Sequence, residues 1–488
     1  MRRPDDNPRI SVAIIGSGMA GLASGYLLKQ DHSQRFDVQV FEMQDKLSLD
    51  SASITIPSQD GKGQRVDLPM RAFAGGFYSN LRKMYTHLNI KYISMRFLFP
   101  LSKAPSSSAE TGSKPYYIHS SNNHRIPPVR PEHLGLVDWI AETIYLLVCF
   151  AWYTICCFFI PPYTPPRSPS TDKSKQQPLS ESLSEYFHRI RLPTYFVNNY
   201  ILPQASAMTT CTHDELLNFP ANDLIEYATQ TYNVPYYVVD GGVNRVQKKL
   251  AEGLDIQLNS RVVSIENVGA KVRVSYRLTT DRSSNSNNVV VTHQRDFDHA
   301  IMAVTPDVVG AIFQPLRAAM AQIPTTSVET IVHNDTSSLS PLSLSQTRTT
   351  TPCSKSHLSA RQQQRNGRET QVIHIRSSPG GGGITEAIHE CSPSVLVTTL
   401  PVTPVDPAKI IHRTRFTRVL RTPRSKEVIN RIFDGPGTTS GGQQWRNGEG
   451  NVWLVGGWCW DGMVLLEGCI VSAMRVADGL GVRVPWRG

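Results

Sequence analysis

The feature that most constrains the fold is a strand–turn–helix–strand pattern close to the N-terminus. Residues 12–15 are an apolar run that predicts a buried parallel strand, and residues 37–41 predict a second strand. Between them lie a glycine-rich turn and a helical pattern. This order of parts predicts a βαβ unit that binds a dinucleotide, and a βαβ turn without a ligand is the alternative. The turn reads Gly16-Ser17-Gly18-Met19-Ala20-Gly21.

Each position of this turn has a physical reason. Gly16 allows a tight turn after the strand, Gly18 lets the backbone approach a pyrophosphate, and Gly21 lets the helix pack closely on the strand. Met19 and Ala20 open the helix, where free N–H groups and the positive end of the helix dipole attract phosphate. The turn is therefore the predicted phosphate site.

The second strand ends in Glu42, which follows the turn by about 20 residues. A carboxylate at this position accepts hydrogen bonds from ribose hydroxyls. This favours FAD or NAD over NADP, whose ribose carries a phosphate. The turn and the acid together do not decide between FAD and NAD.

Composition sets the broad class of the protein. The chain has 488 residues, of which 40% are hydrophobic, so we expect two or three domains. The formal net charge is +10, but Lys and Arg are scattered along the chain. A basic solvated surface is one interpretation, and attraction to anionic lipid head groups is the other. The sequence contains no recognisable nucleic-acid-binding module, so no nucleic-acid partner is expected.

The cysteines and the N-terminal residues indicate the cellular compartment in which the protein is expected. The eight cysteines form no C-x-x-C pair, and the nearby histidines lack zinc-ligand spacing, so we expect no metal site. Reduced thiols are typical of an intracellular protein. The first nine residues, MRRPDDNPR, contain no apolar signal core. We therefore expect a cytoplasmic or membrane-associated protein without an N-terminal signal peptide.

Residues 140–160 read IAETIYLLVCFAWYTICCFFI and carry one charged residue, Glu142, before Pro161-Pro162. A helix of this length could span a bilayer once. It could also be buried in a substrate domain, or lie in the membrane surface as a lipophilic patch. A span is disfavoured because nucleotide-domain sequence lies on both sides of it.

Residues 336–394 differ in composition from the rest of the chain. They contain runs of Ser and Thr, three consecutive glutamines and a run of glycines. Such a composition does not bury a core, so we predict a low-complexity, disordered insertion. A retained intron or a faulty gene model is the alternative.

Four segments in this order resemble one family. They are the turn with Glu42, residues 66–81 (VDLPMR through FYSNL), residues 239–306 (VDGGVNRV, IQLNSRVVSI and FDHAIMAVTP) and residues 452–470 (VWLVGGW through EGCI). Together they resemble the FAD-dependent amine oxidase and phytoene desaturase-like flavoproteins, in particular a branch of predicted NAD/FAD-binding oxidoreductases in fungi and bacteria.

The resemblance implies a fold and a division into domains. The fold is α/β, with a discontinuous Rossmann-like FAD-binding domain of the glutathione-reductase/amine-oxidase type and an inserted α+β substrate domain. The implied FAD-binding parts are residues 1–100, 236–310 and 446–488. The implied substrate-domain parts are residues 101–235 with the apolar helix 140–160, 311–335 and 395–445, and the insertion 336–394 interrupts them.

The resemblance also implies cofactor-binding residues beyond the turn. Val262 would contact the adenine. Lys46 stands where the family has a phosphate-facing arginine. The remaining residues would line the flavin: Met70, Arg71, Gly457, Met463 and Val464.

Three departures from the family pattern predict that FAD is bound differently or more weakly. The stretch Lys46-Leu47-Ser48-Leu49 replaces the family's arginine–x–glycine–glycine. Pro69 stands where many relatives have glycine. Gly457-Trp458 stands where many have an acid that binds the sugar-alcohol chain.

The implied activity is oxidation of a substrate by hydride transfer to flavin N5, with the protein mainly orienting the substrate. The apolar segment 140–160 favours a lipophilic substrate of fatty-acyl, polyene or polyketide type, and a place in secondary metabolism. A flavin-dependent isomerase, an amine oxidase and a degenerate flavin-binding protein without catalysis are the alternatives. Candidate catalytic residues are Trp458 and Trp460, as an aromatic wall, and His333, for proton transfer; each could equally be an ordinary packed side chain.

Overall fold

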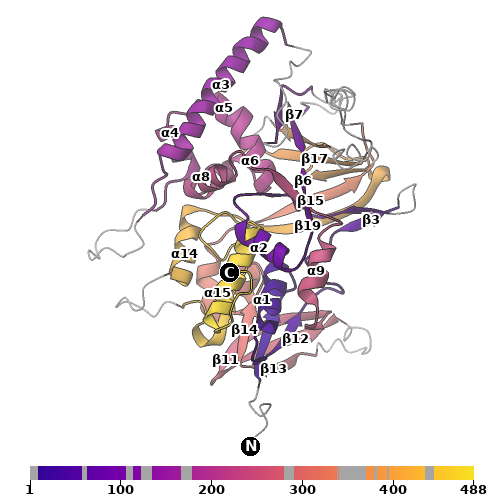
Figure 1. Cartoon of the computed structure of the whole chain (residues 1–488), viewed down its shortest axis with the longest axis vertical. Coiled ribbons are helices and arrows are strands. Elements are labelled where there is room, and N and C mark those ends of the chain that lie inside the picture. Colours follow the sequence, from indigo (N-terminus) through magenta and orange to yellow (C-terminus); the bar gives the residue numbers. More distant parts are fainter. Residues whose placement is uncertain are drawn as a thin grey trace, which may run out of the picture.

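The chain folds into two parts stacked along the long axis of the molecule (Figure 1). The part near the N-terminus holds a parallel sheet, and the other part holds a larger mixed sheet beside a layer of helices. The computed structural model describes residues 9–57, 63–105, 114–121, 134–165, 179–279, 291–337, 339, 370–378, 382–392, 395–434 and 445–487.

The first part is built on a five-stranded parallel sheet. Its middle strand is apolar from Val12 to Ile15, where both of its faces are buried. Val12 and Ile14 pack in one core cluster with residues of helices α1 and α15, whereas Ala13 and Ile15 pack in a second cluster on the opposite face. In spatial order the strands are β10 (Asp255–Gln257), β2 (Phe36–Phe41), β1 (Ile10–Ile15), β14 (His299–Met302) and β20 (Val452–Leu454).

The strands of this sheet come from three separate stretches of the chain, near its start, middle and end. The prediction of a mixed α/β protein with a discontinuous Rossmann-like domain is therefore confirmed. An antiparallel sheet covers the second face: β11 (Ser260–Val268), β12 (Lys271–Leu278) and β13 (His293–Phe297). The helices of this part include α1 (Met19–Lys29), α2 (Ser79–His87), α9 (Asn244–Ala251), α10 (Pro306–Ile312), α11 (Arg317–Met320), α14 (Pro423–Asp434) and α15 (Leu466–Gly479).

A seven-stranded mixed sheet forms the base of the second part. Along each strand, successive side chains point to opposite faces of the sheet, so every second residue lies on the same face. In spatial order they are β19 (Ile410–Val419), β15 (Thr325–His333), β18 (Val395–Thr399), β17 (Thr385–Ser392), β16 (Gln371–Ser377), β7 (Phe97–Lys103) and β8 (Tyr117–Ser120). Smaller sheets pair β3 (Ile54–Ile56) with β4 (Gln64–Val66), and β5 (Phe73–Ala74) and β6 (Tyr92–Met95) with β9 (Tyr236–Val239).

The sheet strands β16 and β17 correct one prediction. Both lie inside residues 336–394, which were expected to be a disordered insertion, yet they pair with each other and with β7 and β18. Val372, Ile375 and Ile388 are buried, so this stretch does contribute to a core. Residues 340–369, with the glutamine run, lie outside the described residues.

A layer of helices lies beside this sheet. Two of them begin at capping boxes, in which a hydroxyl at the N-cap and a glutamate three residues later satisfy the first N–H groups. Ser182 pairs with Glu185 in this way, and Thr212 pairs with Glu215. The helices are α4 (Leu183–Arg189), α5 (Thr194–Phe196), the π-helical turn η1 (Val197–Ile201), α6 (Leu202–Thr209), α7 (His213–Leu217) and α8 (Ala221–Gln230).

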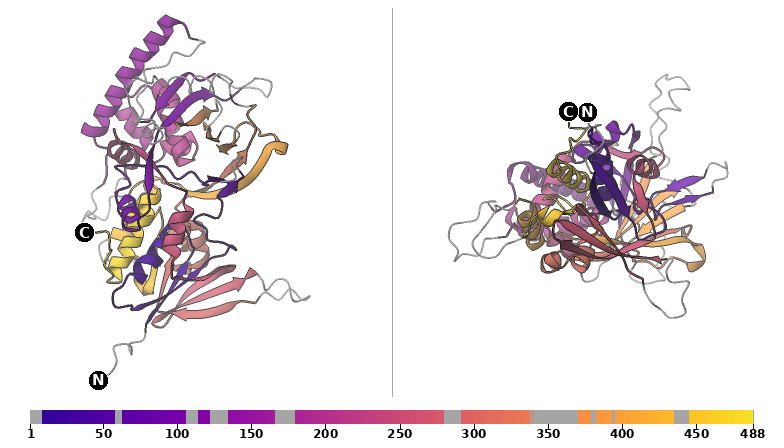
Figure 2. Two further views of the ribbon diagram at one scale, coloured as in Figure 1. Left: turned by 45° about the vertical axis from the view of Figure 1, so that its right-hand side comes forward. Right: turned by 90° about the horizontal axis from the view of Figure 1, so that it is seen from below.

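Helix α3 (Leu136–Phe159) runs along the outer edge of this layer, and one end of it projects past the rest of the protein (Figure 2). Pro161-Pro162 ends it because proline cannot continue a helix. Within the described residues, α3 is the one helix long and apolar enough to cross a membrane. In its most apolar 18-residue stretch, 22% of the residues are buried. It contacts α8 on its inner side.

Candidate active site

A cavity of about 830 Å³ lies where the two parts meet. One face of the seven-stranded sheet forms one wall, helices α3, α6 and α8 form another, and the glycine turn of the first part closes the end. Residues two apart on the same strand line it, such as Val328 and Thr330 on β15 and Ala387 and His389 on β17. The cavity therefore connects the predicted dinucleotide site to a chamber in the second part.

The glycine turn has the geometry expected for a phosphate site. Gly16 has a φ of +100°, and a Cβ on Gly21 would lie 2.1 Å from the Gly16 carbonyl oxygen, so helix α1 packs directly on the turn. Gly18 begins α1 without a side-chain cap and lines the cavity, with Met19 and Ala20. A Cβ on Gly18 would meet only Ser48 Oγ, at 3.8 Å. The start of α1 thus opens onto the cavity at Gly18, while the backbone N–H of Ala20 donates to the Cys469 thiol.

Glu42 lies at the end of β2, beside this turn, and is buried. Its carboxylate accepts hydrogen bonds from Ser17 N (3.1 Å), Ser17 Oγ (2.5 Å) and Gln44 N (3.0 Å). These bonds fix the carboxylate at the edge of the phosphate site. The predicted ribose contact is compatible with this place and stays a prediction.

Two other predicted nucleotide contacts lie away from the cavity lining. Lys46 is exposed to solvent. The loop instead brings Ser48 next to Gly18, and Ser48 N donates to Ser17 Oγ at 2.8 Å. Val262 is buried on β11, where the register with β12 shifts between Val262 and Ser264. Its adenine contact stays a prediction.

Arg71 is a cation in the middle of the cavity wall, next to Met70. Its Nη2 donates to the Leu49 carbonyl oxygen at 3.0 Å, while its buried Nε has no hydrogen-bond partner among the described residues. Burial lowers the pKa of Arg71. A buried donor without a partner is costly, so this position favours a ligand that accepts a hydrogen bond or carries negative charge.

The loop after β20 supplies the other predicted flavin contacts. The cavity lining includes Gly457, Met463 and Val464, all three of them predicted flavin contacts. The fold thus brings them into the same cavity as the glycine turn. The loop is held from behind by Arg421, which is fully buried and donates from Nη2 to three of its carbonyl oxygens. These acceptors are those of Trp458 (3.3 Å), Trp460 (2.8 Å) and Gly462 (3.1 Å).

Arg421 is in turn part of a buried charge cluster. Asp223 on α8 lies 3.8 Å from Arg421 Nε and pairs closely with Lys426 Nζ on α14. All three side chains are buried. The cluster thus connects helix α8 of the helical layer to the loop after β20, which we call the flavin-side loop. Sequence reasoning did not identify it, because its members lie about 200 residues apart.

The three candidate catalytic residues differ in position. Trp458 is buried and lines the cavity, and its Nε1 donates to the Val304 carbonyl oxygen at 3.1 Å. Trp460 does not line the cavity, since its Nε1 donates to the Met463 carbonyl oxygen at 2.9 Å and its ring packs on Phe77. Trp460 therefore braces the loop rather than forming a wall.

His333, the candidate for proton transfer, does not line the cavity. Val328 and Thr330 place the even-numbered residues of β15 on the cavity side, so His333 points to the other face. Its Nε2 lies 2.7 Å from Thr398 Oγ1, and its Nδ1 accepts from Asp335 N at 3.2 Å. Burial lowers its pKa. It is a satisfied, neutral side chain of the sheet.

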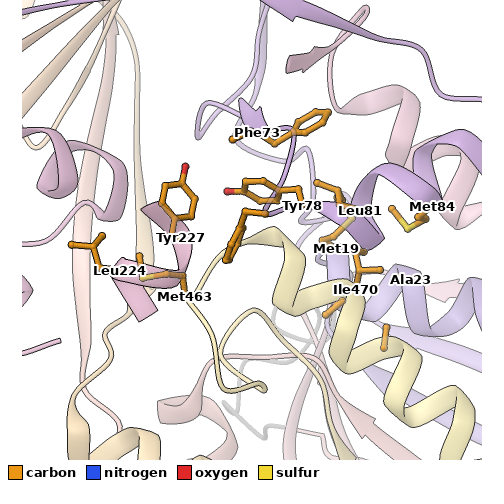
Figure 3. Packing of buried hydrophobic residues seen from close by; sticks show 14 of the residues in the cluster. Met19, Ala23, Phe73, Tyr78, Leu81, Met84, Leu224, Tyr227, Met463 and Ile470 are labelled. Carbon is orange, nitrogen blue, oxygen red and sulfur yellow. The ribbon is translucent and has the colours of Figure 1, made fainter. Parts of the chain in front are cut away.

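Aromatic side chains line much of the cavity. Figure 3 shows Tyr78 and Tyr227 on facing elements beside Met463 and Leu224, at the border between the flavin-side loop and helix α8. Burial raises the pKa of Tyr227 well above its ordinary value, so it is a neutral phenol. Further aromatic residues continue this lining toward α3: Phe97, Phe99, Phe150, Tyr153, Phe158, Tyr200, Phe219, Tyr232 and Tyr236.

Arg418 is the second cation of the cavity and was not predicted from the sequence. It comes from the end of β19, and its Nε donates to Thr210 Oγ1 at 3.0 Å. Burial, and then the charge of Arg71, lower the pKa of Arg418 to about 10, so it stays protonated at neutral pH. Asp67 is the one carboxylate among the described lining residues, and it accepts from Val243 N at 2.9 Å.

The sequence matches two protein families at places that agree with this geometry. One is described as "NAD(P)-binding Rossmann-like domain" and matches residues 14–88, and the other as "Flavin containing amine oxidoreductase" and matches residues 163–355. The two matches support the FAD-dependent amine oxidase-like superfamily. This flavoprotein is an FAD-dependent oxidoreductase.

Two solved structures share its fold. A CLA-producing fatty acid isomerase from P. acnes is 12% identical over 98% of this chain and 99% of that chain, with a TM-score of 0.56. An oxidoreductase from Methanosarcina mazei is 11% identical over 96% of this chain and 100% of that chain, with a TM-score of 0.53. No curated protein matches the sequence significantly.

The residues present fit FAD. The uncapped start of α1 and the free space over Gly18 suit a pyrophosphate. The unpartnered Nε of Arg71 suits the electron-rich edge of a flavin, and it lies in the same cavity as Met463 and Val464. These residues would hold the cofactor at the border between the two parts of the molecule.

Proposed function

We propose that this FAD-dependent oxidoreductase acts on a lipophilic small molecule of fatty-acyl, polyene or polyketide type. The observation that carries the proposal is the aromatic chamber that continues from the flavin-side loop to helix α3. Apolar walls select an apolar substrate because water leaves both surfaces on binding. Oxidation or desaturation of such a substrate is favoured over amine oxidation.

FAD, when bound, would supply the hydride acceptor for oxidation or desaturation of the substrate. The chain's own task is to orient the substrate and exclude water. Tyr78 and Tyr227 flank the place where the chamber meets the loop. Their raised pKa values keep both phenols neutral at physiological pH.

Arg71 and Arg418 add a positive pole to an otherwise apolar chamber. Burial, and then repulsion by the charge of Arg71, lower the pKa of Arg418. A carboxylate or another anionic head group on the substrate would relieve this repulsion. We therefore propose a substrate with an apolar body and an anionic end.

A flavin-dependent isomerase is the second candidate. It is favoured by the likeness in fold to the fatty acid isomerase from P. acnes, which covers 98% of this chain. An isomerase would shift a double bond without net electron transfer. The two candidates therefore differ in whether an external electron acceptor is consumed.

Anaerobic mixing of the FAD-loaded protein with long-chain unsaturated fatty acids tests the proposal. An oxidoreductase bleaches its flavin absorbance once and needs an acceptor to continue. An isomerase converts the fatty acid repeatedly with no acceptor. Arg418→Met is expected to weaken fatty acid binding at least tenfold, whereas Arg418→Lys keeps the charge and loses less. Bleaching by amines and not by lipophilic acids would refute the proposal.

A further inference from the structure

Helix α3 exposes an apolar face that nothing in the described part of the chain covers. Twenty large hydrophobic side chains of the described residues are exposed, and ten of them lie on this single helix. Between residues 144 and 159, no exposed residue of α3 is polar. The ten are Leu136, Val137, Ile140, Ile144, Leu147, Val148, Trp152, Ile155, Phe158 and Phe159.

The opposite face of α3 is fastened to the protein. Glu142 accepts hydrogen bonds from the hydroxyls of Tyr195 and Tyr200. Phe150 packs edge-on against Phe196, with ring centroids 4.8 Å apart. At the edge of the exposed face, Trp152 Nε1 also donates to the Ile190 carbonyl oxygen, at 2.9 Å. A spanning helix would be surrounded by lipid, and these contacts along its length prevent that. These contacts favour a helix that lies flat on a membrane over one that spans it.

The flanks of the face have the chemistry of a membrane interface. Trp152 lies at its edge, next to the exposed Arg189 and Arg191 on either side of Ile190. Exposed tyrosines, Tyr163 and Tyr195, also lie beside it. Tryptophan, tyrosine and arginine gather at the level of lipid head groups, where one end of the side chain is apolar and the other is hydrated.

The cavity reaches the surface at this same face. Phe158 and Tyr232 both line the cavity, and they are 49% and 57% exposed. Their rings contact each other at a centroid distance of 5.4 Å. A side chain that is both exposed and part of the lining marks the mouth of a cavity, so the chamber opens beside the apolar face of α3.

We propose that α3 docks this enzyme on a lipid bilayer, lying in the membrane plane, so that the cavity opens to the lipid between Phe158 and Tyr232. The docking rests on the surface of α3 alone, and the use of the mouth by a lipid-borne substrate rests on the proposed function. A second copy of the chain fits less well, because protein interfaces need hydrogen bonds and a polar rim. Acyl chains need neither.

Vesicle flotation of the full-length, FAD-loaded protein tests the docking. The vesicles contain phosphatidylcholine with or without phosphatidylserine. The test variant is Leu147→Ser/Val148→Ser/Ile155→Ser. The matched control, Val268→Ser/Val291→Ser/Val308→Ser, removes three exposed apolar side chains far from α3. We expect the wild type and the control to float and the test variant to lose at least tenfold of its bound fraction.

Other results would overturn the docking. Wild-type protein that stays at the bottom of the gradient, or a test variant that floats equally well, would do so. Resistance of the bound protein to alkaline carbonate would show a span instead. A dimer abolished by the test variant, without flotation of the wild type, would show that a second copy covers the face. The flavin absorbance of each variant shows separately whether it is folded and holds its cofactor. A variant that floats but does not act on lipophilic substrates would contradict the proposed function and leave the docking intact.

Discussion

Two glycines of the phosphate turn give the sharpest test of the site because the structure separates their roles. A Cβ on Gly21 would lie 2.1 Å from the Gly16 carbonyl oxygen and 3.0 Å from Ala303 Cβ. These atoms must move apart by about 1 Å, and such overpacking costs about 1–3 kcal/mol or more. A Cβ on Gly18 has its nearest contact at 3.8 Å, and its φ of −70° suits any residue.

Gly18→Ala should therefore leave the apo protein within about 1 kcal/mol of wild-type stability. Its methyl group would stand where the pyrophosphate approaches the start of α1, so we expect FAD binding to weaken by about 2 kcal/mol, or roughly 30-fold in Kd. Gly21→Ala should lower stability even without cofactor.

The assays are urea unfolding of the apo variants and FAD titration by flavin fluorescence. Wild-type FAD affinity in Gly18→Ala would refute the placement of the pyrophosphate at α1. Wild-type stability in Gly21→Ala would refute the close packing of α1 on the turn.

Asp223→Asn should lower the free energy of unfolding by about 3–5 kcal/mol, because it leaves Arg421 and Lys426 buried without their carboxylate. Urea unfolding measures this loss. The control Asp37→Asn, at an exposed position, should change the free energy of unfolding by less than about 0.5 kcal/mol. Burial lowers the pKa of His389 to about 4. As the pH falls, the unfolded chain therefore binds a proton at this histidine before the folded protein does. The free energy of unfolding should fall by about 3 kcal/mol as the pH drops from 6.5 to 4. His389→Gln should flatten that slope in unfolding curves measured across this range. Removal of FAD should lower the melting temperature, and cofactor at about 100 times its Kd should restore about 2.7 kcal/mol.

Each of these predictions has a contradicting result. Equal losses in Asp223→Asn and Asp37→Asn would show that the buried cluster is not a stabilising contact. An unchanged pH slope in His389→Gln would show that other groups control acid sensitivity. A melting temperature that does not respond to FAD would show that the cofactor does not bind the folded state preferentially.

The sequence predicts those parts of the fold that depend on neighbouring residues. The apolar run of β1, the glycines and Glu42 are close together in the chain, and local geometry alone brings them into one site. The contact between Ser17 and Glu42 is of this kind. Met70, Arg71, Met463 and Val464 reach the same cavity from far apart, and only the family resemblance indicated them.

The strands β16 and β17 could not be predicted because their polar residues hide the pattern. Arg376 pairs with Glu386 at 3.1 Å, and His374 pairs with Glu390 at 2.6 Å, across the two strands. Each charge looks like a solvated residue until its partner strand is known. The low-complexity sequence before β16 strengthened the wrong interpretation.

Arg418 was missed for a related reason. It lies on β19, whose sequence IIHRTRFTRV reads as a solvent-facing strand with several cations. Its neighbours Arg413 and Arg415 are indeed exposed and pair with Glu329. Only the position of β19 at the border between the two parts turns Arg418 into the cavity.

The central claim is that this cavity holds FAD. The most direct measurement is the visible absorbance spectrum of the purified protein, followed by heat release and chromatography of the cofactor. We expect the bands of oxidised flavin and the release of FAD, and we expect Gly18→Ala to reduce both. A colourless protein that also fails to take up added FAD would contradict it.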